Sequence, residues 1–372
     1  METCDVIIVG GGPAGSSCAW KLRDAGLEVV VVDSASFPRD KVCAGWITPA
    51  VVEELQLDLA DYRRDRILQP ITGFVTGLIG GGELTTDFDQ PVSYGIRRCE
   101  FDDYLLRRCG ATLCLNEPLS SLRREGRAWI LNERMQAPVL IGAGGHFCPV
   151  ARRFVPAAKE NEDSVVAAQE IEFEMTESQR EQCSVSGNRP ELFFCPDLRG
   201  YGWVFRKGDF LNVGLGREHE HHLSSHRAAF VEFLQAGGNI PRDIPQHFHG
   251  HAYRLRGAPQ QAHEPGVLLI GDSAGLADRQ SGEGIRPAIE SGLLAASAIL
   301  ECRSATEADL SEVFQQKLQT RLSNQSSSAI SAWIPSALRL SAARWLLSTH
   351  WFTRRVLLSR WFLHTEQPPL VV

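Results

Sequence analysis

Apolar and polar residues follow one another at the start of the chain in an order that predicts a strand, a turn, a helix and a second strand. Val6–Val9 is a short apolar run, and residues 16–25 have helical character until Gly26 stops the helix. Residues 29–32 form a second apolar run. Two short apolar runs joined through a helix are typical of a β-α-β unit in a parallel sheet.

The turn between the first strand and the helix carries glycines in the spacing G-x-G-x-x-G. Gly10 permits a tight turn, Gly12 lets the backbone approach a pyrophosphate, and Gly15 lets the helix pack close to the strand. The helix N-terminus adds free N–H groups and a positive dipole end. Asp33, 18 residues after Gly15, can accept hydrogen bonds from ribose hydroxyls. We therefore predict a dinucleotide site, with Gly10, Gly12, Pro13, Ala14, Gly15 and Asp33 as cofactor-binding residues.

Strand patterns dominate two later stretches. In residues 70–94, glycines lie among β-forming residues, which predicts short antiparallel strands joined by turns. Residues 160–217 are also strand-rich, with apolar and polar residues alternating from Gln169 onward. Such alternation is typical of an antiparallel sheet with one buried face, which we interpret as a separate substrate-binding layer. Tyr201 and Trp203 share one face of this sheet, where they either line a pocket or pack in the core.

The pattern of the first unit returns in residues 266–298. The apolar run 267–270 ends at Gly271 and Asp272, and a helix over 285–300 follows a loop that ends at Gly284. An acid at the end of a strand suits a second polyol contact. The helix would direct its N-terminus into the same crevice, where its dipole would stabilise negative charge on a reduced flavin ring.

Basic residues stand at two positions near the predicted crevice. Arg39 and Lys41 lie in the loop after the second strand, where they either reach the phosphates of a dinucleotide or belong to a solvated loop. Arg97 and Arg98 lie at the start of a helix predicted over 94–106. The helix dipole disfavours cations there, so this pair either meets an anion such as a phosphate or forms a surface pair.

The length, composition and net charge of the chain narrow the class of protein to which it can belong. The chain has 372 residues, enough for two domains or one large interrupted domain, and its 43% hydrophobic and 22% charged residues are ordinary for a globular protein. A net charge of −7 disfavours nucleic acid. The 10 cysteines include no CxxC pair, and we expect no signal peptide and no spanning helix. We therefore expect reduced thiols and a cytoplasmic location.

Two further clusters have competing interpretations. His219, Glu220, His221 and His222 suggest a metal site, but no second Cys/His cluster supports it, so we favour a solvated loop and expect no metal. Residues 329–364 hold four of the eight tryptophans. Their interleaving with arginines fits interfacial helices in peripheral contact with a membrane, or else a helical cap or a dimer surface. These residues are Trp333, Trp345, Trp351 and Trp361, with Arg339, Arg344, Arg354, Arg355 and Arg360.

Three separated stretches together resemble the FAD-binding domain of the para-hydroxybenzoate-hydroxylase-like flavoproteins. They are the glycine turn with Asp33, the sequence Arg98-x-x-Phe101-Asp102, and Gly271-Asp272 followed by residues 281–285. Within that group the chain looks most like the geranylgeranyl reductase family, through residues 37–46, 201–216 and 271–285.

The resemblance implies an α/β fold in which a Rossmann-like FAD-binding domain is interleaved with an antiparallel β-sheet substrate domain and followed by C-terminal helices. The expected boundaries are 1–69, 95–155 and 258–302 for the FAD domain, 70–94 and 156–257 for the substrate domain, and 303–372 for the helices. The resemblance also implies FAD as cofactor, with NAD(P)H as a candidate electron donor.

The same resemblance implies roles for individual residues. Arg98 would contact the FAD phosphates, and Asp272 the ribityl chain. From its place in the loop after the second strand, we also predict Arg39 as a cofactor-binding residue. Cys43 matches a cysteine that lies near the flavin in the reductases and is the candidate catalytic residue. The residues expected beside the isoalloxazine are Gly282, Gly284 and Ile285, and those expected around the substrate are Trp46, Tyr201, Trp203 and Glu283.

The chain departs from its relatives in three places. Gly144-Gly145 replaces the usual Asp-Gly, which weakens the case for a nicotinamide contact there. Arg206 stands where the reductases have proline, and residues 278–280 lack the family's proline. The W-x-W-x-I-P stretch of the flavin halogenases is absent, which disfavours halogenation.

Three functions remain open at this point. The first is reduction of C=C bonds in an isoprenoid or other apolar substrate by reduced FAD. The second is hydroxylation of an aromatic substrate, including a tryptophan of a partner protein during quinone-cofactor maturation. The third is a flavin-bearing assembly factor without catalysis. A long apolar tunnel would favour the first function, and a compact polar pocket or an open basin the second, because the fold itself supports both.

Overall fold

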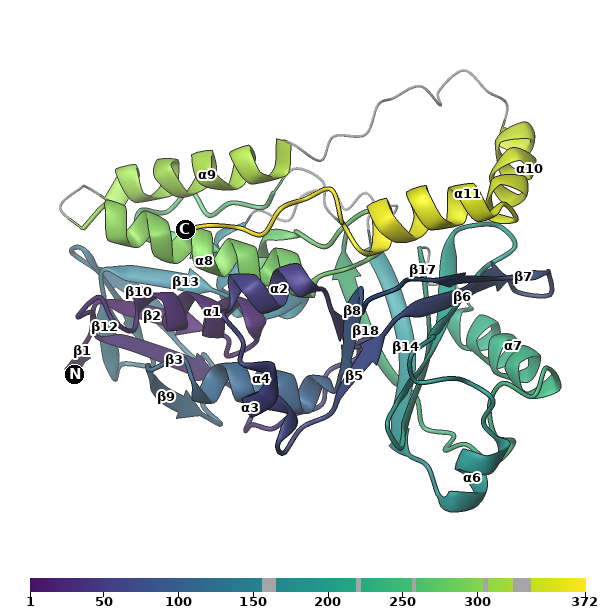
Figure 1. Cartoon of the computed structure of the whole chain (residues 1–372). Coiled ribbons are helices and arrows are strands. Elements are labelled where there is room, and N and C mark those ends of the chain that lie inside the picture. Colours follow the sequence, from purple (N-terminus) through teal and green to yellow (C-terminus); the bar gives the residue numbers. More distant parts are fainter. Residues whose placement is uncertain (156–164, 219–221, 256–258, 304–306, 324–335) are drawn as a thin grey trace.

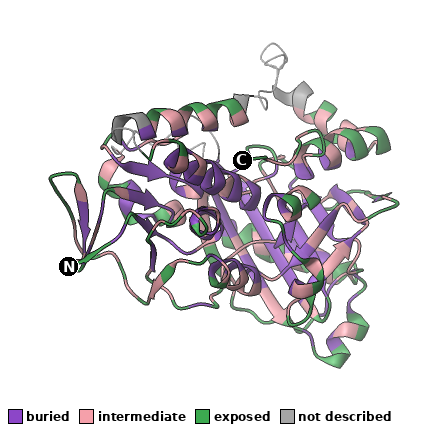
Figure 2. Cartoon of the chain, turned by 60° about the vertical axis from the view of Figure 1, so that its left-hand side comes forward, coloured by how far each residue is buried: buried purple, intermediate pink, exposed green. Residues whose placement is uncertain are grey.

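The computed structural model describes residues 1–155, 165–218, 222–255, 259–303, 307–323 and 336–372 (Figure 1). They form a five-stranded sheet and a seven-stranded sheet, with two smaller sheets and a set of helices around them. Buried residues run through both large sheets, whereas exposed residues lie on the outer helices and on the loops and hairpins at the edges (Figure 2). This arrangement confirms the predicted α/β class.

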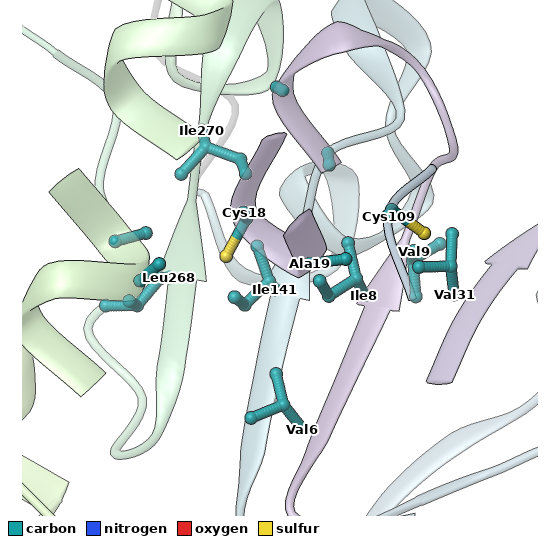
Figure 3. Packing of buried hydrophobic residues seen from close by; sticks show 14 of the residues in the cluster. Val6, Ile8, Val9, Cys18, Ala19, Val31, Cys109, Ile141, Leu268 and Ile270 are labelled. Atoms are coloured by element: carbon teal, nitrogen blue, oxygen red, sulfur yellow. The ribbon is translucent and has the colours of Figure 1, made fainter. Parts of the chain in front are cut away.

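The five-stranded sheet is parallel and has the order β19-β13-β2-β3-β9. Its central strand, β2 (Val6–Val9), is buried along its whole length, as expected for a short apolar run in a sheet covered on both faces. The core around it contains Ile8, Val31, Ile141 and Leu268 from four neighbouring strands (Figure 3). The other strands are β3 (Val29–Asp33), β9 (Thr112–Leu115), β13 (Val139–Gly142) and β19 (Val267–Leu269).

Helices and a small sheet cover the parallel sheet. Helix α1 (Pro13–Leu22) packs along α8 (Ile285–Glu301), and α8 carries α9 (Glu307–Ser323) on its outer side (Figure 1). A four-stranded sheet also packs into the same core through Trp129 and Met135. Its strands, in spatial order, are β1 (Glu2–Thr3), β12 (Met135–Ala137), β11 (Ala128–Leu131) and β10 (Leu122–Glu125).

The contact between α1 and α8 is unusually close because a glycine faces a backbone carbonyl. A Cβ atom on Gly292 of α8 would lie 2.3 Å from the carbonyl oxygen of Ala14. On the other side of the turn, a Cβ on Gly15 would lie 2.0 Å from the carbonyl oxygen of Gly10. Both positions therefore exclude any side chain, and the two helices meet directly beside the glycine turn.

The seven-stranded sheet is antiparallel except between β15 and β6. Helix α7 (Leu223–Ala236) packs on one face through Phe230 and Leu234. The other face packs against the C-terminal segment through Trp203 and Phe205. In spatial order the strands are β18 (His249–Arg254), β14 (Val165–Glu174), β17 (Phe210–Glu218), β16 (Gly200–Lys207), β15 (Glu191–Phe194), β6 (Gly73–Leu78) and β7 (Glu83–Asp87).

A three-stranded sheet and several short helices connect the two large sheets. Its strands have the order β4 (Trp46–Ile47), β8 (Ser93–Ile96) and β5 (Leu68–Ile71). The helix predicted over 94–106 is wrong at its start, because Tyr94 pairs with Ile47 and Pro70 within this sheet. The short helices are α2 (Pro49–Glu54), α3 (Leu59–Arg63), α4 (Arg98–Arg107), α5 (Pro149–Phe154) and α6 (Glu177–Gln182), with the 3-10 turns η1 (Gly145–Phe147) and η3 (Gly271–Ala274).

The C-terminal segment crosses the molecule and returns to the half built on the five-stranded parallel sheet. It contains α10 (Ser336–Leu347), α11 (His350–Phe352) and the π-helix η5 (Thr353–Phe362), followed by an extended end that lies beside α8 (Figure 1). The buried guanidinium of Arg286 holds this end by donating to the carbonyls of Gln367 and Pro368, at 3.3 and 3.0 Å. Trp333 lies outside the described residues. No helix in the described residues is long and apolar enough to cross a membrane.

We predict that Gly292→Val lowers the free energy of unfolding by about 1–3 kcal/mol, because the added side chain separates α8 from α1. Chemical denaturation followed by circular dichroism measures the change. Gly82→Val is the matched control, since a Cβ at Gly82 meets no atom within 4 Å and the residue lies in an exposed turn. Equal stability of the two variants would contradict the close helix contact.

Candidate active site

A cavity of about 500 Å³ lies between the carboxyl ends of the parallel strands and the seven-stranded sheet. Val9 and Val32 line it from β2 and β3, and Ala168 lines it from β14. Every predicted site residue except Gly15, which is buried beneath the turn, reaches this cavity. The predicted residues that line it are Gly10, Gly12, Pro13, Ala14, Asp33, Arg39, Cys43, Trp46, Arg98, Tyr201, Trp203, Asp272, Gly282, Glu283, Gly284 and Ile285.

The glycine turn presents the start of α1 to the cavity. Gly10 has a φ of +120°, and a Cβ there would lie 2.4 Å from the backbone of Ala143, so only glycine fits. Gly12 is the N-cap of α1, and no side chain caps its free N–H groups. A Cβ on Gly12 would meet only the Nη2 of Arg39, at 3.3 Å. Uncapped amides beneath a guanidinium form a site that fits the pyrophosphate of a dinucleotide.

Asp33 is fixed at the end of β3 by two backbone donors. Its Oδ2 accepts from the N–H of Gly11 at 2.7 Å, and its Oδ1 accepts from the N–H of Ala35 at 2.8 Å. Each carboxylate oxygen can accept more than one hydrogen bond. Because the carboxylate also lines the cavity, it has acceptor capacity left for ribose hydroxyls.

Two arginines in the cavity wall share one carboxylate. Arg98 forms a bidentate pair with Asp102, with both N···O distances 2.9 Å, and the Nη2 of Arg39 lies 3.3 Å from the same carboxylate. Burial alone would lower the pKa of Arg98, but the Asp102 carboxylate outweighs burial and raises it. Two cations on one buried anion leave this wall with a net positive charge, which suits an anionic cofactor.

The other arginine of this helix start lies elsewhere. Arg97 pairs with Glu100 at 2.9 Å and with Glu172 at 3.3 Å, and it does not line the main cavity. The anions that this cation meets are therefore carboxylates of the protein. The two neighbouring arginines have separate surroundings because successive residues of a helix point in different directions.

The second glycine-rich motif reaches the cavity from the opposite side. Asp272 lies in η3, and a Cβ on Gly284 would lie 3.2 Å from its Oδ1. Gly282 has a φ of +71°, a conformation that favours glycine. The hydroxyl of Tyr201 donates to the carbonyl of Ser281 at 2.5 Å and ties this loop to the seven-stranded sheet. The start of α8 is thereby held at the cavity.

Aromatic side chains form the wall on the side of the seven-stranded sheet. The indole N–H of Trp203 donates to the Oδ1 of Asn212 at 2.7 Å, so its polar atom is satisfied and its ring is left to form apolar wall. The ring of Phe362 lies 5.8 Å from that of Trp46 and 5.4 Å from that of Tyr201, between centroids. The C-terminal segment therefore closes this side of the cavity. Burial keeps the pKa of Tyr201 well above its usual value, so its hydroxyl stays protonated.

The thiol of Cys43 is half-buried in the same cavity. Its sulfur accepts from the N–H of Gly45 at 3.4 Å, and Arg98 also hydrogen-bonds with it. The side chain of Asn212 donates to the carbonyl of Cys43 at 3.2 Å and holds the backbone in place. The thiol is thus positioned, partly exposed to the cavity and next to a cation.

Two cavity residues, His251 and Tyr253, have no counterpart in the sequence-based prediction. Both come from β18 and alternate along it, so they share a face. Lys41, expected near phosphates or in a solvated loop, contacts the Nε2 of His251 instead. The sequence signal for this group is the alternation of His247, His249, His251 and Tyr253. The same alternation is typical of a strand at a solvent-exposed sheet edge, so it does not identify a site.

His219, Glu220 and His221 lie outside the described residues. Within the described ranges, no group of three His, Cys, Asp or Glu residues is arranged to hold a metal ion. All 10 cysteines are free thiols.

Comparison with known proteins points to flavoproteins. Residues 5–86 match the FAD dependent oxidoreductase family, DAO. The chain is 30% identical to menaquinone reductase of Mycobacterium tuberculosis over 80% of its own length and 77% of that protein. It is 26% identical to digeranylgeranylglycerophospholipid reductase of Methanocaldococcus jannaschii, over 84% and 81% of the two chains.

A similar solved structure is a geranylgeranyl bacteriochlorophyll reductase-like protein from Thermoplasma acidophilum. The TM-score is 0.73 at 20% identity, covering 93% of this chain and 88% of that one. At this level of identity the likeness shows a shared fold.

We predict that Gly12→Val abolishes FAD retention, because the valine methyl groups project into the pyrophosphate site from a position with room for a Cβ.

We predict that Asp272→Ala weakens FAD binding about tenfold, equivalent to roughly 1.4 kcal/mol. Absorbance of the purified proteins and titration of the apoproteins measure both effects. Gly82→Val, in the exposed β6–β7 turn, should retain FAD, and wild-type FAD content in the Gly12 and Asp272 variants would refute the assignment.

Proposed function

The chain belongs to the geranylgeranyl reductase-like family of FAD-dependent oxidoreductases, and from this premise we propose that it reduces carbon–carbon double bonds of an isoprenoid or similarly apolar substrate. The observation that carries the proposal is the aromatic wall of Trp46, Tyr201 and Trp203 beside the Gly282–Gly284 loop. Relatives named as reductases of menaquinone and of a digeranylgeranyl lipid support the same choice.

The residues of the cavity fit FAD as its cofactor. The Gly10–Ala14 turn and Arg39 would hold the pyrophosphate, and Asp33 the adenosine ribose. Asp272 would hold the ribityl chain. Gly282, Gly284 and Ile285 would lie beside the ring system, at the N-terminus of a helix whose dipole favours negative charge.

Reduction of a double bond adds a hydride to one carbon and a proton to the other. Bound FAD, once reduced, supplies the hydride. The chain would bind the apolar part of the substrate against Trp46 and Trp203, with Phe362 excluding water from that side. The thiol of Cys43 is positioned to hold the proton at its sulfur, and Arg98 beside it stabilises the thiolate left after transfer. We propose NAD(P)H as the donor that reduces the cofactor again.

A second candidate is favoured by the size of the cavity. Its volume of about 500 Å³ has to accommodate a dinucleotide as well as a substrate, and Phe362 packs against Tyr201 in its aromatic wall. The second cavity is lined largely by charged and polar side chains, so it does not extend the aromatic wall into an apolar tunnel. A compact space suits hydroxylation of an aromatic ring, including a tryptophan side chain offered by a partner protein.

The C-terminal segment offers a surface for lipid, and we propose that it places the enzyme on anionic membranes. Trp345 and Trp351 are 67% and 68% exposed, whereas Trp20, Trp46, Trp129 and Trp203 are buried. Residues 340–365 contain four arginines and no acidic residue, within a chain of net charge −7. Exposed Trp and Arg together favour the interface of an anionic bilayer, where each basic residue contributes about 1 kcal/mol.

One experiment separates the two reactions. The enzyme is reduced chemically without oxygen, mixed with a digeranylgeranyl lipid that has double bonds but no quinone ring, and followed by flavin absorbance and by mass spectrometry of the lipid. Oxidation of the flavin with a gain of two hydrogens in the lipid supports the reductase. If the flavin is oxidised only after air is admitted, and an aromatic substrate gains an oxygen atom, the reductase proposal is wrong and hydroxylation is supported.

We predict that Cys43→Ala lowers kcat by about 100-fold or more, the usual effect of losing a general acid, while FAD content stays unchanged. Steady-state turnover with flavin absorbance measures both quantities. Cys114→Ala is the control, because Cys114 lies in β9 and does not line the cavity. Unchanged turnover in the Cys43 variant would remove this thiol from the mechanism.

We predict that Trp345→Ser combined with Trp351→Ser releases the protein from phosphatidylglycerol vesicles in a sedimentation assay. Loss of two interfacial aromatic anchors should lower the bound fraction at least about tenfold, since each ring contributes about 1 kcal/mol or more. Vesicles of phosphatidylcholine alone test the charge requirement. Equal sedimentation of variant and wild type would contradict lipid contact.

A further inference from the structure

A second cavity of about 490 Å³ lies beside the first and shares a wall with it. The shared wall consists of loop residues 40–43 together with Arg98 and His251, which line both spaces. Unlike the first cavity, the second contains no part of either glycine motif. It is therefore a second space that borders the active site at this wall.

Most of the second cavity is lined by side chains that exchange protons. His247 and His249 are exposed and enter it from the solvent side. Their rings are 4.8 Å apart between centroids, and His251 follows on the same face of β18. The histidines thus form a row from solvent to the shared wall.

Lys41 completes the row at the wall. Its Nζ contacts the Nε2 of His251, and the lysine lines both cavities. Beyond Lys41 lie the groups of the active site, among them Cys43 from the same loop and Asp272 from η3, both of which interact electrostatically with the lysine. No phosphate-binding or substrate-binding task in the proposed function uses this lysine.

We propose that Lys41 and His251 form the proton route of the active site, carrying protons from the solvent-filled second cavity, past His249, to the cavity that holds Cys43. An imidazole can accept a proton on one ring nitrogen and release one from the other, which suits His251 to this position. Lys41 then holds the proton at Nζ on the active-site side.

Both reactions considered for this enzyme need such a route. Reduction of a double bond by a nicotinamide donor consumes one proton from solvent for each hydride transferred. Hydroxylation with the same donor and oxygen also consumes one proton and releases water. In the reductase, the proton from Lys41 restores the thiol of Cys43 after each turnover, and this last step rests on the proposed function.

The electrostatics of the pair agree with the route. Burial lowers the pKa of Lys41 to about 8, so the ammonium can release its proton near neutral pH. Burial and the charge of Lys41 lower the pKa of His251 to about 3, which keeps the imidazole neutral between transfers. The charged and titratable groups that face the pair are Arg39 and Cys43 from the loop, Arg98 from α4, His146 from η1 and Asp272 from η3.

The first test measures proton uptake without any organic substrate. The bound flavin is reduced anaerobically in a stopped-flow instrument by the reduced methyl viologen radical, an electron donor that releases no protons when it is oxidised, and a pH-indicator dye reports the protons taken up. Lys41→Met and His251→Leu should each slow uptake about tenfold or more at unchanged flavin content, the effect expected when a positioned proton carrier is lost. His226→Leu, in α7 and outside both cavities, is the control.

Chemical rescue distinguishes proton transfer from a structural role. Methylamine should restore much of the rate of proton uptake in Lys41→Ala, and imidazole should do the same in His251→Ala. Competitive acetylation of the wild-type enzyme should show Lys41 titrating near pH 8. Wild-type uptake in both variants, or slowed uptake that neither base rescues, would overturn the route. None of these results depends on which substrate is reduced or hydroxylated.

Discussion

The contact between Gly292 of α8 and the backbone of Ala14 organises the cofactor half of this protein. With no Cβ on Gly292, α8 lies directly against the first turn of α1. Gly271 also faces Ala14, since a Cβ on Gly271 would lie 3.1 Å from the Cβ of Ala14. Two helix N-termini from opposite ends of the chain therefore open into one cavity, and the dipoles of both favour negative charge there.

A carboxylate and backbone amides of the protein hold the charged side chains of this cavity in place. Asp102 keeps the guanidinium groups of Arg98 and Arg39 in the wall, and backbone amides keep Asp33 oriented. Groups fixed in this way need little reorganisation when an anionic cofactor binds, which reduces the entropy lost on binding. The same arrangement places a cation beside Cys43, so a structural ion pair also determines the surroundings of the candidate catalytic thiol.

The wall opposite the cofactor half depends on the end of the chain. Phe362 packs on Trp46 and Tyr201, and the segment beyond it is held by Arg286 on α8. His364 also pairs with Glu283 of the cavity at 3.3 Å, and although burial opposes it, this contact raises the pKa of the histidine. The C-terminal segment thus joins the two halves of the site and supports the aromatic wall from behind, since Trp46 and Tyr201 line the cavity.

The sequence by itself determined the parts of the site that depend on short spacings. The glycine turn, Asp33 and the glycine loop before α8 were all predictable, because neighbouring residues dictate turns, caps and helix faces. The α/β class followed from the same local patterns. Only the tertiary structure decided that Lys41 meets His251 and that Phe362 closes the aromatic wall. Those contacts join residues far apart in sequence, and their geometry follows from how the sheets and helices pack rather than from any periodicity along the chain.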